Sequence, residues 1–142
     1  MNRMGVLLVM GLASVGCDQG PSVIFQDGDT DVDVLGPELS HEYDPSPRTF
    51  GEAIFLGANV LDASDIKDVK IVFQRETDGS SWTELRMAPY SDSYYEGSIP
   101  GKEVESGGIR YYIFASDQYD NTSCLPEACE AEAWHFPVVP PR

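Results

Sequence analysis

Aspartate and asparagine side chains gather at two predicted turns, and carboxylate and amide oxygens are the ligands that calcium prefers. The candidate ligands are Asp62, Asp65, Asp117 and Asp120, with Asp68 and Asn121 beside them. The same residue types also dominate turns, because their side chains bond nearby backbone groups. We therefore favour turn formation and assign no metal site, while calcium binding stays open as the alternative.

A further acidic stretch, residues 27–38, partly resembles an EF-hand calcium loop. It has acidic residues at the first, third, fifth, seventh and twelfth positions of a twelve-residue window. The sixth position is Val32, where the sharp turn of such a loop needs glycine, and no helical pattern flanks the window. We interpret this stretch as a solvated acidic linker.

Two of the three cysteines, Cys124 and Cys129, are separated by four residues and can pair with each other. A disulfide between them is expected in an oxidising compartment. A zinc site would need four ligands, and His135 is the single histidine near the pair. The spacing also differs from the Cys-x-x-Cys of redox proteins.

No catalytic motif accompanies the two histidines, His41 and His135. The sequence has no Gly-x-Ser-x-Gly, no His-Glu-x-x-His and no phosphate-binding glycine loop. We therefore expect no enzymatic activity and no cofactor.

The chain is strongly acidic. Its 142 residues include 24 acidic and nine basic residues, and the net charge is −15. Such a chain repels nucleic acid, because phosphate backbones attract clusters of Lys and Arg. The composition favours a soluble surface outside the cytoplasm, or alternatively a surface that meets cations or basic partners.

Residues 1–16 have the pattern of a secretory signal peptide, with Arg3 ahead of a short apolar run. The run is shorter than the roughly 20 apolar residues that a membrane-spanning helix needs. The small residues before Cys17 resemble the lipobox of bacterial lipoproteins, although Ser14 stands where leucine is usual. The resemblance implies that Cys17 becomes the first residue of the mature protein and carries palmitate-type acyl chains. A plain secretory signal with a chance cysteine is the alternative.

The acyl chains would anchor the protein in a membrane of the cell envelope. Asp18 resembles the inner-membrane retention signal of enteric lipoproteins, but the choice between inner and outer membrane stays open. Residues 17–38 are predicted to form a disordered tether, since residues 18–47 contain eight acidic residues and neither Lys nor Arg.

The remaining residues, 39–142, alternate apolar and polar side chains with the period of two that is typical of strands. The clearest case is residues 109–116, where Ile109, Tyr111, Ile113 and Ala115 share one face. Seven strands are expected, in residues 39–43, 51–61, 69–74, 82–87, 94–99, 109–116 and 131–139. Pro137 places the last strand at a sheet edge. The pattern predicts an all-β, seven-stranded antiparallel sandwich.

Motifs across residues 39–139 resemble the immunoglobulin-like, fibronectin-type-III-like domains of bacterial surface and secreted proteins. They include Tyr94-Tyr95-x-Gly97-x-Ile99-Pro100 and Tyr111-Tyr112-Ile113-x-Ala115-x-Asp117. Such domains serve as spacers, adhesion modules and subunits of assemblies. Asp120 stands where the family usually has glycine. The resemblance also implies that the Tyr111 hydroxyl bonds a loop backbone, as in a tyrosine corner; a plain half-buried tyrosine is the alternative.

Aromatic side chains on outward strand faces are the candidate contact residues: Trp82, Tyr94, Tyr95, Tyr112 and Phe114. Exposed aromatic residues mark protein or carbohydrate recognition. We expect a lipid-anchored envelope protein of a Gram-negative-type bacterium that contacts another envelope protein as a structural or assembly subunit. A carbohydrate-binding or adhesion module, with or without calcium, is the alternative.

Overall fold

A computed structural model describes residues 32–77 and 81–142. The predicted signal peptide, Cys17 and most of the predicted tether lie outside the described residues. Asp33 to Arg142 form one compact unit. Within the described residues, no helix has the length and apolar character needed to cross a membrane.

The described fold is all-β, with eleven strands, two short 3-10 helices and no α-helix among the described residues. The strands are β1 (Glu38–Ser40), β2 (Arg48–Thr49), β3 (Ile54–Leu61), β4 (Ile66–Arg75), β5 (Thr83–Arg86), β6 (Ala88–Pro89), β7 (Tyr94–Ile99), β8 (Ile109–Asp117), β9 (Thr122–Leu125), β10 (Trp134–Phe136) and β11 (Val138–Val139). The 3-10 helices are η1 (Gly101–Glu103) and η2 (Cys129–Glu132).

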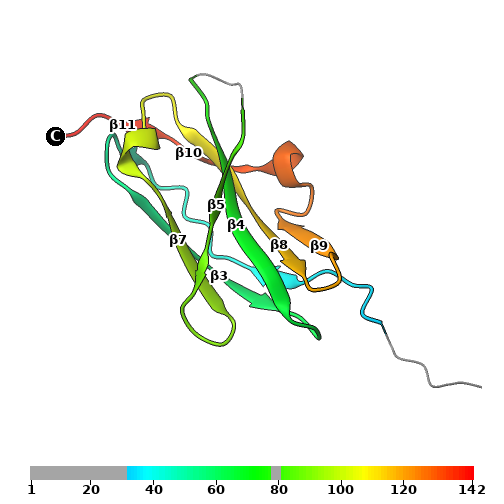
Figure 1. Ribbon diagram of the computed structural model, residues 1–142. Coiled ribbons are helices and arrows are strands. Elements are labelled where there is room, and N and C mark those ends of the chain that lie inside the picture. The colour runs from blue at the N-terminus through cyan, green and yellow to red at the C-terminus, as the bar shows by residue number, and fades with distance from the viewer. Residues whose placement is uncertain (1–31, 78–80) are drawn as a thin grey trace, which may run out of the picture. The chain divides into compact units, whose positions relative to one another are not determined.

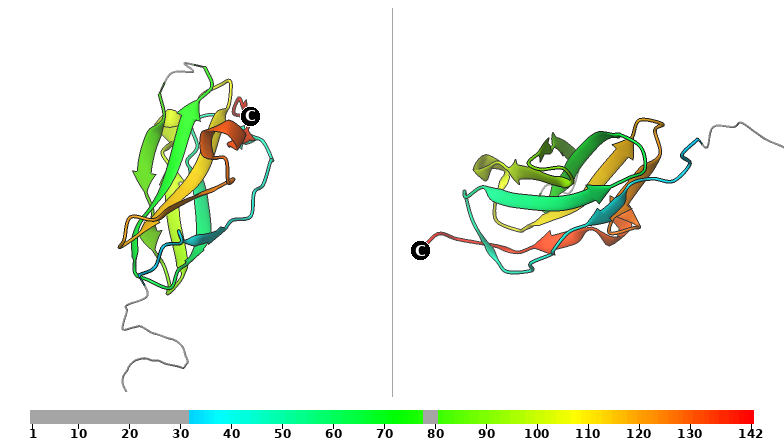
Figure 2. Two further views of the ribbon diagram at one scale, coloured as in Figure 1. Left: turned by 90° about the vertical axis from the view of Figure 1, so that its right-hand side faces the viewer. Right: turned by 90° about the horizontal axis from the view of Figure 1, so that it is seen from below.

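Two antiparallel sheets enclose the core (Figures 1 and 2). One has the strand order β1-β3-β7-β6, and we call it the first sheet. The second sheet has the order β10-β8-β4-β5, with β9 paired to the C-terminal half of β8. A short parallel pair, β2 with β11, lies outside both sheets.

The predicted count of seven strands is wrong, because β2 and β9 were not predicted and because the chain changes sheets at two further points. The predicted strand 82–87 continues past Met87 as β6, so that β5 joins the second sheet and β6 the first. The predicted last strand is divided at Pro137, where β10 ends and β11 begins to pair with β2. Alternation within each segment could not reveal these changes of partner.

The predicted inward faces are confirmed. Ile109, Tyr111, Ile113 and Ala115 of β8 have no exposed surface. The core is completed from β3, β4, β7, β10 and two loops by Ile54, Leu56, Ala58, Val60, Val69, Ile71, Phe73, Met87, Ile99, Val104 and Phe136. Full burial of each large apolar side chain contributes about 1.5–3 kcal/mol. This packed interior holds the strand ends, and hence the turns, in fixed places.

Candidate functional site

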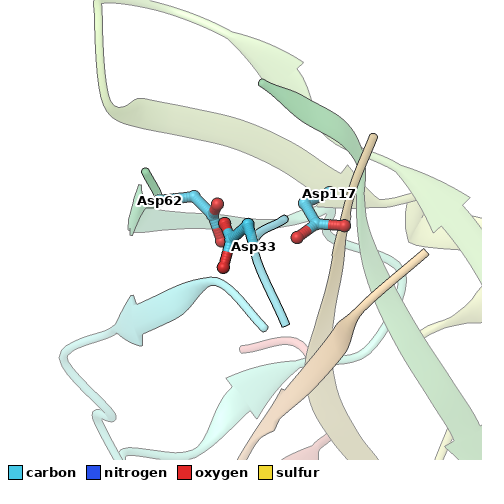
Figure 3. Close-up of side chains that lie close together, drawn as sticks. All are labelled: Asp33, Asp62 and Asp117. Carbon is cyan, nitrogen blue, oxygen red and sulfur yellow. The ribbon is translucent and has the colours of Figure 1, made fainter. Parts of the chain in front are cut away.

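Three carboxylates from distant parts of the sequence meet at one end of the sandwich. Asp33, Asp62 and Asp117 each offer an oxygen, and these oxygens lie within 4.8 Å of one another. Figure 3 shows the three side chains gathered together. Asp33 precedes β1, Asp62 directly follows β3, and Asp117 is the last residue of β8.

Strand pairing brings these three residues together. β1 runs antiparallel to β3, with Glu38 opposite Leu61, so the segment before β1 starts beside the end of β3. The Asn121 side-chain amide then ties that segment to the β8–β9 turn, because it donates to the Asp33 carbonyl at 2.9 Å and to Asp117 Oδ2 at 2.8 Å.

Hydrogen bonds to neighbouring backbone groups orient each carboxylate. Asp117 Oδ1 accepts from the backbone amides of Tyr119 and Asn121 at 2.8 and 2.9 Å. Asp62 Oδ1 accepts from the amide and hydroxyl of Ser64 at 2.8 and 2.7 Å. Asp62 and Asp117 therefore form the turns that their residue types predict.

The same bonds keep two of the carboxyl groups ionised. Burial opposes ionisation of Asp117, but the bonds from Asn121 and Tyr119 outweigh it and hold its pKa below the ordinary value. The Ser64 hydroxyl lowers the pKa of Asp62 against the opposing effect of burial. Negative charge is thus concentrated at this end of the sandwich.

Asp33 was not among the candidate ligands selected from the two turns. Its Oδ1 accepts from the Leu35 amide at 3.0 Å, whereas its Oδ2 is buried and has no hydrogen-bond partner among the described residues. The only sequence feature that indicated Asp33 as a ligand was its place at the seventh position of the EF-hand-like window. Residues 27–31 of that window lie outside the described residues.

The other two candidate ligands lie apart from this cluster. Asp120 pairs with Lys67 at 2.5 Å and adopts a left-handed backbone with φ of 66°, at the position where the family usually has glycine. Asp65 is exposed, and its backbone carbonyl accepts from the Gln118 amide at 2.9 Å. Each predicted turn therefore contributes one aspartate to the carboxylate cluster, Asp62 from the first turn and Asp117 from the second.

The expected disulfide is present. Cys124 of β9 and Cys129 of η2 are bonded, with their Cα atoms 5.3 Å apart. The bridge ties β9 to η2 within the connection that leads from β9 to β10, and both of these strands pair with β8. His135 pairs with Glu76 at 3.2 Å.

The five candidate contact aromatics do not share one surface. Trp82, Tyr112 and Phe114 are half-buried on the outer face of the second sheet. Cations cover two of these rings: Arg110 lies 5.3 Å from the ring centroid of Trp82, and Lys70 lies 5.6 Å from that of Phe114.

The other two candidates are neighbours on β7 and point in opposite directions. Tyr95 packs against the core. Tyr94 lies on the outer face of the first sheet, where its ring covers the backbone of Gly57. Its neighbour on that face, Phe55, is 81% exposed.

Sequence reasoning missed the role of His41, which fixes the core tyrosine of β8. Its Nδ1 bonds the Gly57 carbonyl and its Nε2 bonds the Tyr111 hydroxyl, both at 2.7 Å. Tyr111 thus bonds a histidine side chain, and not the loop backbone that the family resemblance implies. Both ring nitrogens of His41 are engaged in structural contacts.

Comparison with known proteins supports the fold alone. No family model and no curated protein matches the sequence. A superoxide reductase (neelaredoxin) from Ignicoccus hospitalis is similar in structure, with a TM-score of 0.50 and 8% identity over 74% of this chain and 82% of that one. The endo-beta-1,4-mannanase from Thermotoga petrophila gives a TM-score of 0.51 and 11% identity over 83% of this chain and 26% of that one. At such identities neither activity transfers to this chain.

Proposed function

We propose that this protein is a lipid-anchored, non-catalytic subunit of the bacterial cell envelope that acts by contact with another envelope protein. Cys17 carries the acyl anchor in this proposal, and the tether is shorter than predicted, because the compact unit already begins at Asp33 and Glu38 belongs to β1. The lipobox-like sequence before Cys17 and the acidic, Lys- and Arg-free stretch after it support this arrangement.

We further propose an immunoglobulin-like identity for the sandwich. Such domains place strands A, B, E and D in one sheet and strands C, F and G in the other. The orders β1-β3-β7-β6 and β10-β8-β4-β5 are consistent with this arrangement, and β5 would be an additional edge strand beside strand C. Because a shared fold does not determine function, the proposed contact has to be argued from the surface of this chain.

One observation carries the proposed protein contact: the outer face of the first sheet exposes large apolar side chains on and beside its strands. Phe55 and Leu61 of β3 are 81% and 55% exposed, and Tyr90, directly after β6, is 74% exposed. A groove of about 550 Å³ lies beside Phe55, with Tyr94 and Asn59 in its wall. Exposed apolar surface of this kind marks contact sites on proteins.

A pull-down from solubilised envelope tests the proposed contact. The full-length protein should capture one envelope protein in stoichiometric amount, and Phe55→Ala should reduce the capture at least tenfold without lowering Tm, because the side chain is exposed. Tyr119→Ala is the matched control, because Tyr119 is about equally large and half-exposed but belongs to the β8–β9 turn of the second sheet. Failure to capture any stoichiometric protein would refute the proposed role.

Fractionation of cells tests the anchor separately. The wild-type protein should sediment with membranes, and Cys17→Ser should release it into the soluble fraction. Membrane association that survives this substitution would exclude Cys17 as the anchor.

Carbohydrate binding is the second candidate, and a shallow pocket of about 610 Å³ on the second sheet favours it. The rings of Trp82 and Tyr112 border this pocket with centroids 5.4 Å apart, and Arg110 adds hydrogen-bond donors. A glycan array probed with the wild-type protein and with Trp82→Ala distinguishes this candidate from the first, because only glycan binding should depend on Trp82.

A further inference from the structure

We propose that Asp33, Asp62 and Asp117 bind one calcium ion, and that this ion fixes the segment before β1 against the turns that follow β3 and β8. The inference concerns the sandwich itself and does not depend on the identity of an envelope partner. It rests on the positions of three carboxylates and on one buried oxygen that lacks a partner.

The spacing of the oxygens fits a single ion. Calcium–oxygen distances are about 2.3–2.6 Å, so two oxygens on the same ion can be at most about 5 Å apart. The oxygens offered by Asp33, Asp62 and Asp117 lie within 4.8 Å of one another. Oxygens at this spacing can come to one ion by small movements of their side chains.

Each carboxylate keeps free lone pairs for such an ion. A carboxylate can accept about four hydrogen bonds in total, two at each oxygen. The Oδ1 atoms of Asp62 and Asp117 each accept two bonds, and Asp117 Oδ2 accepts one from Asn121. One lone pair of Asp117 Oδ2 therefore remains, together with the Oδ2 atoms of Asp62 and Asp33.

The oxygen that most requires a partner is Asp33 Oδ2. This one atom is buried and has no hydrogen-bond donor among the described residues, although Asp33 as a whole is half-buried; Asp117 beside it is fully buried. Within the described part of the chain, no Lys, Arg or His forms an ion pair with any of the three carboxylates. A buried polar oxygen without a partner is costly, and a bound cation removes that cost.

The chemistry of the site favours calcium over other divalent ions. All donors are hard carboxylate oxygens, whereas zinc prefers nitrogen and sulfur ligands. An ion at the buried Asp33 Oδ2 must shed water, which magnesium does reluctantly. Calcium accepts six to eight ligands in irregular geometry, so water can complete the shell.

Calcium titration of the full-length protein in detergent, after treatment with EDTA, tests the proposal. At about 5 mM calcium we expect Tm to rise by roughly 5 °C, because sites of this kind bind at about 0.1–1 mM. Asp33→Asn and Asp62→Asn should each abolish the rise. Asp65→Asn should retain it, because that substitution removes an equal charge from the same turn but outside the cluster.

Three results would overturn the proposal. The first is that calcium changes Tm no more than an equal concentration of magnesium does. The second is that Asp33→Asn retains the full calcium effect. The third is that calcium has no effect while mild acid raises Tm in EDTA, which would assign a proton shared by Asp33 and Asp62 instead of an ion. Isothermal calorimetry should detect one calcium site per chain in the wild type. If it detects no calcium binding, the proposal is overturned in the same way as by an absent Tm shift.

Discussion

The hydroxyl of Tyr111 offers the sharpest test of how the core is held together. Its side chain is fully buried, and burial raises its pKa, so the hydroxyl stays protonated. The Gly57 carbonyl can only accept, so Nδ1 of the neutral His41 ring carries the hydrogen and Nε2 accepts from the Tyr111 hydroxyl. Tyr111→Phe therefore removes the donor and leaves Nε2 of His41 without a partner.

The expected cost follows from this geometry. Loss of a hydrogen bond that leaves one buried group unpaired costs about 1–3 kcal/mol. His41 is half-buried, which places the expected loss in unfolding free energy near the middle of that range, at about 2 kcal/mol. For a unit of this size, that loss lowers Tm by roughly 8 °C.

Urea unfolding and calorimetry of the wild type, Tyr111→Phe and Tyr112→Phe provide the measurement. Tyr112 is the next residue of β8 and faces the other way, and its hydroxyl has no hydrogen bond within the described residues. We expect Tyr112→Phe to stay within about 0.5 kcal/mol of the wild type. The reasoning is refuted if Tyr111→Phe is equally silent, or if both substitutions cost the same.

Three further predictions concern the pH response, the turn after β8 and the disulfide. Burial lowers the pKa of His41 from its ordinary value of 6.5, so the unfolded chain binds more protons than the folded protein. The contribution of His41 to the unfolding free energy should therefore be complete above pH 6.5 and fall as the pH drops below it. Urea unfolding between about pH 7.5 and about pH 5 should show this pH dependence in the wild type and lose it in His41→Gln. Asn121→Ala removes the amide that bonds buried Asp117 and should cost about 1–3 kcal/mol, with faster amide exchange in the segment before β1. Replacing Cys124 and Cys129 together by Ser should cost at most about 2 kcal/mol, because the closed loop is short; a larger loss of Tm would show that the bridge organises more than its own loop.

Much of the fold could be predicted because strand faces are a local property. Alternation in residues 109–116 identifies the buried face of β8, since successive side chains of a strand point to opposite sides whatever lies beside it. The Cys124–Cys129 bridge could also be predicted, because its two ends are close in sequence and must be close in space. The sequence assignments of Cys17 and the signal peptide stay predictions, since they lie outside the described residues.

The candidate site required the tertiary structure. Asp62 and Asp117 were predicted as members of two separate turns, and only the pairing of β1 with β3 and of β4 with β8 places them beside Asp33. The two tyrosines of β7 differ in this respect, because consecutive residues of a strand must face opposite sides, so Tyr94 and Tyr95 could not both point outward; the packing of the sheets decided only that Tyr95 is the one against the core.

The amino-acid sequence by itself determined the all-β character, the inward faces and the short disulfide, because each depends on neighbouring residues and on the period of the strand. The tertiary structure decided the number of strands, the bond between His41 and Tyr111, and the meeting of three carboxylates. These features arise from contacts between residues far apart in the chain, and their free energy depends on which strands pair and in what register.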